Sequence, residues 1–567
     1  MACFPRSFLV ATLALLVCAR GRTADAAEPA EGPPQGPATA PEPAKQPAPE
    51  QAGAVPQGGA QPQDAPKRVT YIPESVKAEL REQIKQEVIA EFWKENWALP
   101  NTVPDWTKRI RLFGDVRVRY ELNLFPPGNA DGGFFPDFNG INTSTPFDMS
   151  KYAVDTSGDK YLNVDTNRSR FRLRARLGAE ADAGHDWTMG LRISTGDGSP
   201  VNAPNQTLGG SGGYFGKFQI WFDQAYIRFN PIHDAGGFLM AEAGRFENPF
   251  FTVRDLLWSE NVNLDGFAFS GAFSAGGGWR PFVVLGASPV YTTAFNYPAE
   301  DTSKFDSMNK WLFAAQLGTD WKPSEKVNLK LGAAFYYFYN ITGEVSPSCD
   351  TNLKNITCST DDSRPSFAQK GNTYIALRTP SANALAAESA FPLVTPRYEY
   401  FGLASQFKEV FATGKFDYLF APAVGLSLEG EFAWNAGFSR TQIAAMNPNL
   451  GGPLNNLEKC TANGCTDYAG GPYAYVGRLT FGTPSDTRQG DWNASIAYLH
   501  VESDAVVDAF TNPDFGMGGT NLKGYWIGGR VAVANNLTLG VRWMSSDQIV
   551  GPTFRFDLLQ VDFWGRF

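Results

Sequence analysis

The 567-residue chain lacks the long apolar runs from which membrane-spanning helices are built. A spanning helix needs about 20 consecutive apolar residues, whereas the best candidate is the shorter stretch Phe8–Cys18. Arg6 precedes this stretch, and the small residues Ala24 and Ala26 follow it. This is the pattern of a cleaved secretory signal peptide. We therefore expect residues 1–26 to be removed and the remaining chain to be exported without a helical anchor.

Histidine is scarce, and the chain as a whole is acidic. None of the three histidines lies close to a cysteine, which argues against a zinc site. Only His500, beside Glu502 and Ser503, has neighbours that a nucleophilic enzyme could use. We expect no enzyme, no metal and no cofactor. The formal charge of −9 becomes −11 after loss of the signal peptide, whose net charge is +2, so nucleic acid is excluded as a partner.

Cysteine is also rare, and its spacing is informative. Two of the six cysteines lie in the predicted signal peptide. The other four form two close pairs, Cys349 with Cys358 and Cys460 with Cys465. An exported protein meets an oxidising compartment, in which such pairs form disulfides. We expect two local disulfides that pin the tips of loops.

The segment after the signal peptide changes character twice. Residues 27–67 consist mostly of Ala, Pro, Gln and Gly, which cannot bury enough surface to fold and predict a disordered spacer. Pro73–Ala98 carries apolar residues at every fourth position and predicts a helix within a segment over 68–105. The narrow apolar stripe favours a short coiled coil. The alternative is a lone amphipathic helix that docks on another surface.

From Arg109 onward, apolar residues recur at every second position instead of every fourth. In Arg168–Asp182 (RSRFRLRARLGAEAD), apolar residues alternate with arginines, and Arg109–Leu122 (RIRLFGDVRVRYEL) shows the same pattern. A strand sends successive side chains to opposite faces, so each stretch has one apolar and one charged face. In a soluble sandwich the apolar face would be the core. In a membrane barrel it would face lipid, and the arginines would face a wet lumen.

The spacing of further alternating stretches favours the barrel. After every odd-numbered stretch the connection is usually long, and after most even-numbered ones it is a short turn, which is how outer-membrane barrels are threaded. We predict about sixteen antiparallel strands in a barrel over residues 106–567. The predicted strands are Arg109–Leu122, Arg168–Asp182, Trp187–Thr195, Phe218–Asn230, Phe238–Arg245, Leu264–Phe273, Arg280–Ala287, Lys310–Trp321, Val327–Tyr339, Gln406–Phe420, Val424–Asn435, Tyr473–Thr483, Trp492–Val501, Lys523–Ala534, Leu537–Met544 and Phe554–Phe567.

Several long motifs occur in a fixed order along the chain. They read YIPESVKAELREQIKQEV, ENWALPNTVPDW, RLFGDVRVRYE, NRSRFRLRARLG, STGDGSPVNAPNQTLGG, GRFENPFF, LLWSENVNLDGFAFS and NPDFGMGGTNLKGYWIG. The chain resembles, from about Tyr71 to Phe567, a family of bacterial outer-membrane proteins named putative porins. The resemblance implies an outer-membrane barrel with an N-terminal periplasmic helical segment and passive diffusion. It does not imply a solute.

A channel requires a lumen, a constriction and a field across it. Alternation places one group of arginines on the lumen side of three consecutive strands, namely Arg111, Arg117, Arg119, Arg170, Arg172, Arg174, Arg176 and Arg192. The third long loop could fold inward as a constriction, with acids that face this wall at Glu247, Asp255, Glu260 and Asp265. The alternative readings are that the arginines pair locally in a wide lumen and that the acids belong to an ordinary external loop.

The sequence therefore predicts an outer-membrane porin that passes small hydrophilic solutes and ions. Homotrimers are expected from the barrel size and the associating helix. Two alternatives remain open: a channel specific for an anion such as phosphate, which arginines would suit, and an envelope tether that the barrel merely anchors.

Overall fold

We describe the protein from a computed structural model. It describes residues 105–149, 160–197, 202–210, 213–295, 304–381, 396–421, 423–446, 452–458 and 467–567, together with Lys85. The predicted signal peptide and spacer, nearly all of the predicted helix over 73–98, and both Cys460 and Cys465 lie outside these residues. No helix among the described residues is long and apolar enough to cross a membrane.

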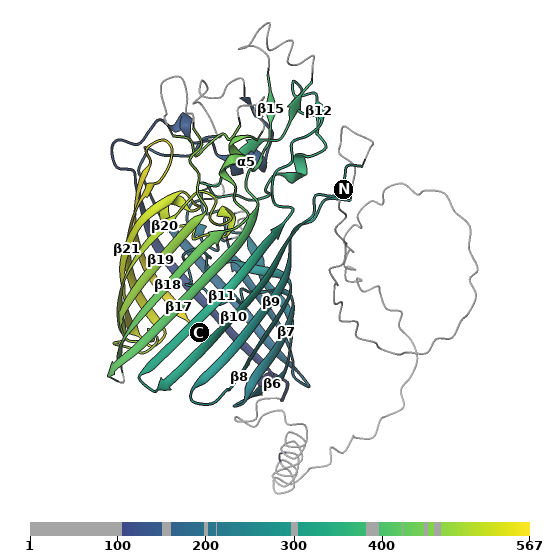
Figure 1. The fold of residues 1–567 in the computed structure, drawn as a ribbon. Helices are drawn as coiled ribbons and strands as arrows, with labels where there is room; N and C mark the ends of the chain where they lie inside the picture. The colour runs from purple at the N-terminus through teal and green to yellow at the C-terminus, as the bar shows by residue number, and fades with distance from the viewer. Residues whose placement is uncertain are drawn as a thin grey trace, which may run out of the picture. The chain divides into compact units, whose positions relative to one another are not determined.

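Within residues 98–567, the part of the chain that the structure describes contains sixteen long antiparallel strands. They form one closed ring (Figure 1). The ring closes because β1 pairs with β3 on one side and with the last strand, β23, on the other. The strands are β1 Ile110–Leu124, β3 Arg168–Gly184, β4 Trp187–Thr195, β6 Ile220–Asp234, β7 Gly237–Glu247, β8 Asn263–Phe273, β9 Trp279–Tyr291, β10 Lys310–Ser324, β11 Val327–Tyr339, β17 Phe407–Ala421, β18 Val424–Asn435, β19 Tyr473–Gly482, β20 Trp492–Val501, β21 Leu522–Ala534, β22 Leu537–Gln548 and β23 Arg555–Arg566.

The predicted strands agree with these bounds to within a few residues. The largest differences are at strand ends, where β6, β9 and β22 each run four residues further than predicted. The sequence placed a turn at Pro231, but the strand continues through this proline. The register of β6 against β7 shifts between Phe229 and Ile232. A proline is tolerated at such a bulge because no ladder hydrogen bond is required of it there.

Connections at the two ends of the barrel differ in length. The turns at one end are mostly short, as at 185–186 and 535–536, and the links at the other end are long, as at 340–406 and 502–521 (Figure 1). The short elements of the long links are α3 Phe138–Asn142, α5 Arg440–Ala444, η1 Gly132–Phe134, η3 Asp361–Ser363, η5 Asp508–Phe510, η6 Phe515–Met517, β2 Phe147–Asp148, β5 Gln206–Thr207, β12 Ser348–Cys349, β13 Tyr374–Ala376, β14 Thr379–Pro380, β15 Tyr398–Glu399 and β16 Phe401–Leu403; α2 Asp105–Lys108 precedes β1.

The two faces of the wall have opposite character, as the period of two requires. Val118 lies between Leu173 of β3 and Phe563 of β23, and all three side chains belong to the outer face. The neighbouring Arg117 and Arg119 point the other way and are buried inside the barrel. The outer face is therefore apolar, and the inner face of these strands is charged.

Candidate functional site: a charged wall facing two inward loops

The arginines of β1 and β3 form a wall on the inner face of the barrel. Arg117 lies directly opposite Arg174, and Arg119 lies opposite Arg172. All four side chains are buried, and Arg174 is only 1% exposed. Burial of so many like charges is unfavourable unless each is compensated, so the inner face must also hold carboxylates.

Two acidic residues of β1 flank its arginines on the same inner face. Asp115 accepts hydrogen bonds from Arg174 at 2.8 Å and from Arg176 at 2.7 Å. Glu121 forms ion pairs with Arg170 at 2.9 Å and with Arg172 at 3.5 Å. Six of the eight predicted lumen arginines are thus gathered in one patch, in which most are paired. We call it the arginine wall, and its residues are Asp115, Arg117, Arg119, Glu121, Arg170, Arg172, Arg174 and Arg176.

The other two predicted arginines make separate pairs. Arg192 of β4 donates to Asp223 at 2.6 Å. Arg111 pairs with Glu180 and its side chain is 72% exposed, so it lies outside the buried patch.

The third long link folds into the barrel and crosses to its far wall. We call residues 248–262, between β7 and β8, loop 3. The backbone N–H of Phe251 donates to Gln316 of β10 at 2.7 Å, and that of Val253 donates to Glu431 of β18 at 3.1 Å. Arg478 of β19 donates to the carbonyl of Arg254 at 3.1 Å. The loop is therefore held on the wall opposite the arginines.

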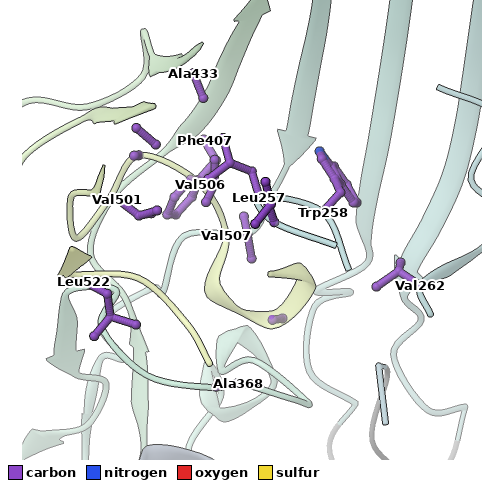
Figure 2. Packing of buried hydrophobic residues seen from close by; sticks show 14 of the residues in the cluster. Leu257, Trp258, Val262, Ala368, Phe407, Ala433, Val501, Val506, Val507 and Leu522 are labelled. Atoms are coloured by element: carbon purple, nitrogen blue, oxygen red, sulfur yellow. The ribbon is translucent and has the colours of Figure 1, made fainter. Parts of the chain in front are cut away.

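Apolar side chains hold loop 3 in place. Leu256, Leu257 and Trp258 are buried in a cluster with inward residues of β11 and β17. Figure 2 shows Leu257 and Trp258 together with Phe407 of β17. The ring of Trp258 lies 5.3 Å from that of Tyr336. These side chains thus pack loop 3 against the apolar part of the far wall and do not contact the arginine wall through this cluster.

A second link, which was not predicted from the sequence, enters the barrel beside loop 3. We call residues 502–521, between β20 and β21, loop 7. Phe510 stacks on Trp258 with ring centres 5.5 Å apart, and its carbonyl accepts from the N–H of Ser259 at 2.8 Å. Asn512 donates through its backbone N–H to the carbonyl of Leu256 and through its side chain to that of Asp255. The motif NPDFGMGG could have indicated this path, since Gly516 and Gly518 adopt positive φ, which glycine allows without strain.

Carboxylates of both loops face the arginine wall. Glu260 lies 3.6 Å from Arg174, and Asp514 lies 2.7 Å from Arg119. Asp255 lies 3.3 Å from Arg542 of β22. Burial alone would raise the pKa of Glu260. The positive charges of Arg174 and Arg117 have the larger effect and lower this pKa to about 2. Burial and the nearby Glu260 raise the pKa of Asp255 to about 6.

The space between loops and wall is small. A cavity of about 40 Å³ lies there, which is room for a few water molecules. It is lined by Arg117, Arg119, Asn205, Asp255, Glu260, Asn261, Pro513, Asp514, Arg530, Thr538, Gly540, Arg542, Asp562 and Trp564. We call it the constriction cavity. Several of its residues, among them Asp255 and Arg530, also line a larger cavity of about 890 Å³ that reaches the short turns near Lys326.

Two of the four predicted loop acids lie elsewhere. Asp265 is on β8 and pairs with Arg245 of β7 at 3.0 Å, and Glu247 is the last residue of β7 and pairs with Arg254 at 3.1 Å. The sequence missed Asp562 of β23, which binds Arg119 at 2.6 Å. Its inward position follows from strand alternation, but its partner is at the opposite end of the chain.

The motif NAPNQTLGG contributes a third inward segment. Asn202 donates to the carbonyls of Ala509 and Thr511 in loop 7, both at 3.1 Å. Asn205 accepts from Arg117 at 2.7 Å. Motifs from three separate loops thus meet at the arginine wall.

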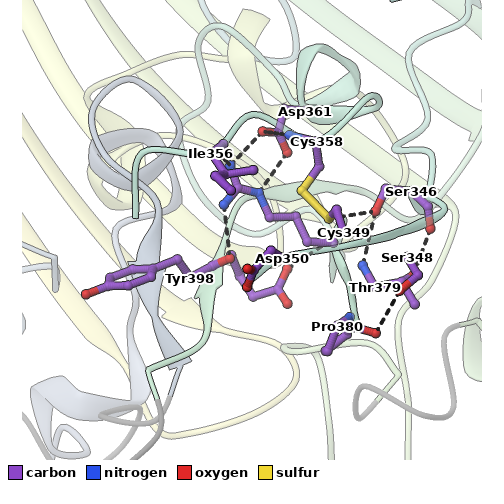
Figure 3. The surroundings of a disulfide bond; sticks show 12 residues. Ser346, Ser348, Cys349, Asp350, Ile356, Cys358, Asp361, Thr379, Pro380 and Tyr398 are labelled. Carbon is purple, nitrogen blue, oxygen red and sulfur yellow. Dashed lines mark hydrogen bonds and ion pairs between the residues drawn. A yellow bond between two sulfur atoms is a disulfide. The ribbon is translucent and has the colours of Figure 1, made fainter. Parts of the chain in front are cut away.

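Cys349 and Cys358 form a disulfide in the long link between β11 and β17, as predicted (Figure 3). The backbone N–H of Cys358 donates to Asp361 at 3.0 Å, and Asp361 forms a buried ion pair with Arg378 at 2.6 Å. The bridge therefore supports a loop-tip network rather than the constriction cavity.

The second predicted disulfide joins Cys460 to Cys465 in the link between β18 and β19. The described part of this link ends at residue 458 and resumes at residue 467, so Cys460 and Cys465 both lie outside the described residues. Among the described residues the structure contains the single disulfide of Cys349 with Cys358. The pairing of Cys460 with Cys465 therefore stays a prediction.

His500 lies 4.0 Å from Glu502 and stacks on Tyr475. The hydroxyl of Ser503 is instead bound to Asp504 at 2.7 Å, so these three residues do not form the arrangement of a nucleophile and its base.

The model of the family described as "Putative porin" matches residues 18–567. No curated protein sequence matches the chain.

Solved structures of porins are similar at low identity. Pseudomonas putida OprB is 13% identical with a TM-score of 0.37, over 81% of this chain and 95% of that one. Salmonella typhi OmpF, solved in complex with daunomycin, is 8% identical with a TM-score of 0.34, over 81% and 97%. The outer-membrane channel DcaP of Acinetobacter baumannii is 12% identical with a TM-score of 0.27, over 81% and 97%. The family match spans nearly the whole chain, and the strands close into a barrel. The chain belongs to the putative porin family and is a porin-like β-barrel channel of the bacterial outer membrane.

Proposed function

We propose that the protein is a general diffusion channel for small hydrophilic solutes and ions. The observation that carries this proposal is the position of loops 3 and 7, which bring carboxylates against the arginine wall and leave a small polar cavity beside it. A barrel that served only as an anchor would have no need of a polar passage next to buried ion pairs. The larger cavity on the short-turn side provides a wide approach to this passage.

The charges at the constriction are arranged across the passage. Carboxylates of Asp255, Glu260 and Asp514 lie on the loop side, and guanidinium groups lie on the wall side. Opposite charges across a narrow lumen create a transverse field, which orients dipolar solutes and slows apolar ones. Solutes are thus selected by size and polarity.

Current through the purified full-length protein in planar bilayers tests this proposal. We expect discrete open-channel steps, and we expect proteoliposomes to swell in small sugars but not in large oligosaccharides. Heat-unfolded protein at the same concentration is the control for detergent leakage. A protein that inserts as a folded barrel, with a heat-dependent shift in gel mobility, but gives no current would instead indicate the tether.

The homotrimer and the periplasmic position of the predicted N-terminal helix remain predictions. We expect the mass in detergent to correspond to three chains, measured by size-exclusion chromatography with light scattering. A chain without residues 27–105 is the matched variant. If the helix drives association, the shortened chain should elute as a monomer, whereas the full-length chain should elute as a trimer.

A further inference from the structure

Among the described residues, one arginine of the constriction cavity has no carboxylate within ion-pair distance. Ion pairs around this cavity join eight arginines to eight acids. The arginines are Arg119, Arg170, Arg172, Arg174, Arg176, Arg530, Arg542 and Arg566, and the acids are Asp115, Glu121, Asp197, Asp255, Glu260, Asp486, Asp514 and Asp562. Arg117 is the ninth arginine. Among the described residues no carboxylate oxygen lies within 4.0 Å of its guanidinium.

The surroundings of Arg117 increase its need for a counter-charge. Its side chain is 8% exposed, and it lies opposite Arg174 of β3 on one side and Trp564 of β23 on the other. Its Nη2 donates to Asn205 Oδ1 at 2.7 Å, while its Nε has no hydrogen-bond partner among the described residues. A buried guanidinium without a counter-charge is unfavourable. The side chain also lines the constriction cavity.

Asn205 occupies the place where an acid would complete a ninth ion pair. Its amide oxygen lies at the distance of a charge-assisted hydrogen bond but carries no net charge. Every other arginine of this cluster has a carboxylate within 4.0 Å, so the neutral partner sets Arg117 apart. The carboxylates of Asp562 and Glu260 act on Arg117 only from beyond 4.0 Å, so its positive charge is partly balanced and can still attract a mobile anion.

We propose that Arg117 and Asn205 form a binding subsite for one small monovalent oxyanion, such as the carboxylate group of an organic acid. This inference rests on the proposed function as a channel. A guanidinium suits the oxygens of one carboxylate, and the Nε of Arg117 still lacks a partner among the described residues. A second negative charge on the solute would be repelled by Asp514 and Asp562, which line the same cavity. The cavity of about 40 Å³ admits the head of the solute but not a bulky body.

Reversal potentials in planar bilayers, measured across gradients of potassium acetate and of potassium sulfate at pH 7, test the subsite. Two variants remove the excess charge by different routes. Arg117→Gln deletes the guanidinium, and Asn205→Asp keeps it but supplies an isosteric carboxylate. Both should lower the permeability of acetate relative to potassium by about fourfold or more, since a unit charge acts across about 5 Å of water. If Arg117→Gln fails to fold, Asn205→Asp still tests the subsite, because it removes the excess charge while Arg117 stays in place.

Two controls separate the subsite from bulk charge. Arg117→Lys retains the positive charge, so its permeability ratio of acetate to potassium should stay close to that of the wild type. Arg109→Gln removes one cation from an exposed position at the start of β1 and should change the ratio little. Acetate current should saturate with concentration in wild type and rise linearly in Asn205→Asp.

The results distinguish the two levels of the proposal. If wild type conducts but Arg117→Gln and Asn205→Asp both match Arg109→Gln, the subsite is wrong and the channel remains. Absence of current in folded wild-type protein would overturn the channel itself. A sulfate permeability that exceeds that of acetate would also overturn the assignment to a monovalent oxyanion.

Discussion

Replacement of Trp258 by Ala should release loop 3 and enlarge the channel. The indole is 3% exposed and lies between two rings, with centres 5.3 Å from Tyr336 of β11 and 5.5 Å from Phe510 of loop 7. These contacts join the far wall, loop 3 and loop 7. The variant removes the side chain that all three share, while the strands keep their ladders.

The size of the effect follows from the burial. Truncation of a buried tryptophan to alanine costs about 3–5 kcal/mol, and this cost falls on the seating of the loops rather than on the barrel. At about 1.4 kcal/mol for each factor of ten, the ratio of displaced to seated loop rises by about a thousandfold. The hydrogen bond from Val253 to Glu431 remains, but a net hydrogen bond contributes only about 1 kcal/mol.

Single-channel recording measures the outcome. We expect a larger or strongly fluctuating conductance for Trp258→Ala, with an unchanged heat-dependent gel shift. Trp187→Ala is the matched control, because Trp187 is exposed on the outer face and stacks on Phe229 instead. The reasoning fails if folded Trp258→Ala has the conductance, the noise and the solute size limit of wild type.

Three further predictions use the same recordings. Because the pKa of Asp255 is raised to about 6, this group gains a proton as the pH falls from 7 to 5. Anion preference should therefore increase over this range, and Asp255→Asn should hold the low-pH value throughout; equal pH dependence in the variant would contradict this. Arg172→Ser with Arg174→Ser removes two positive charges from the wall and should shift selectivity toward cations, whereas an unchanged reversal potential would exclude both residues from selectivity. Cys358→Ser should leave conductance unchanged but cost about 2–3 kcal/mol locally, seen as faster proteolysis within 340–406; equal proteolysis would argue against the network in Figure 3.

The alternation of side chains was enough to predict the wall of the barrel. A period of two fixes which side chains share a face whatever the neighbours are, and Arg117, Arg119, Arg172 and Arg174 therefore had to lie together on one side. The same period, with alternating loop lengths, predicted the sixteen strands. Strand ends were less predictable, as at Pro231, because a bulge can accommodate a residue that usually ends a strand.

The paths of the loops depended on the tertiary structure. Loop 3 was suggested by its acids, yet Asp255 and Glu260 face the wall only because Leu257 and Trp258 are buried against the opposite side. Loop 7 has no periodic pattern, so its position follows from contacts with loop 3 and not from local sequence.

Charge balance shows the difference between sequence and structure most clearly. The sequence alone determined that the lumen would hold many arginines, because a short-range alternation in β1 and β3 encodes their direction. Only the closed barrel determined which of them are neutralised, since Asp562 reaches Arg119 from β23 and Asp514 reaches it from loop 7. Ion pairing depends on distances of a few ångströms between residues hundreds of positions apart, and these distances exist only once the ring has closed.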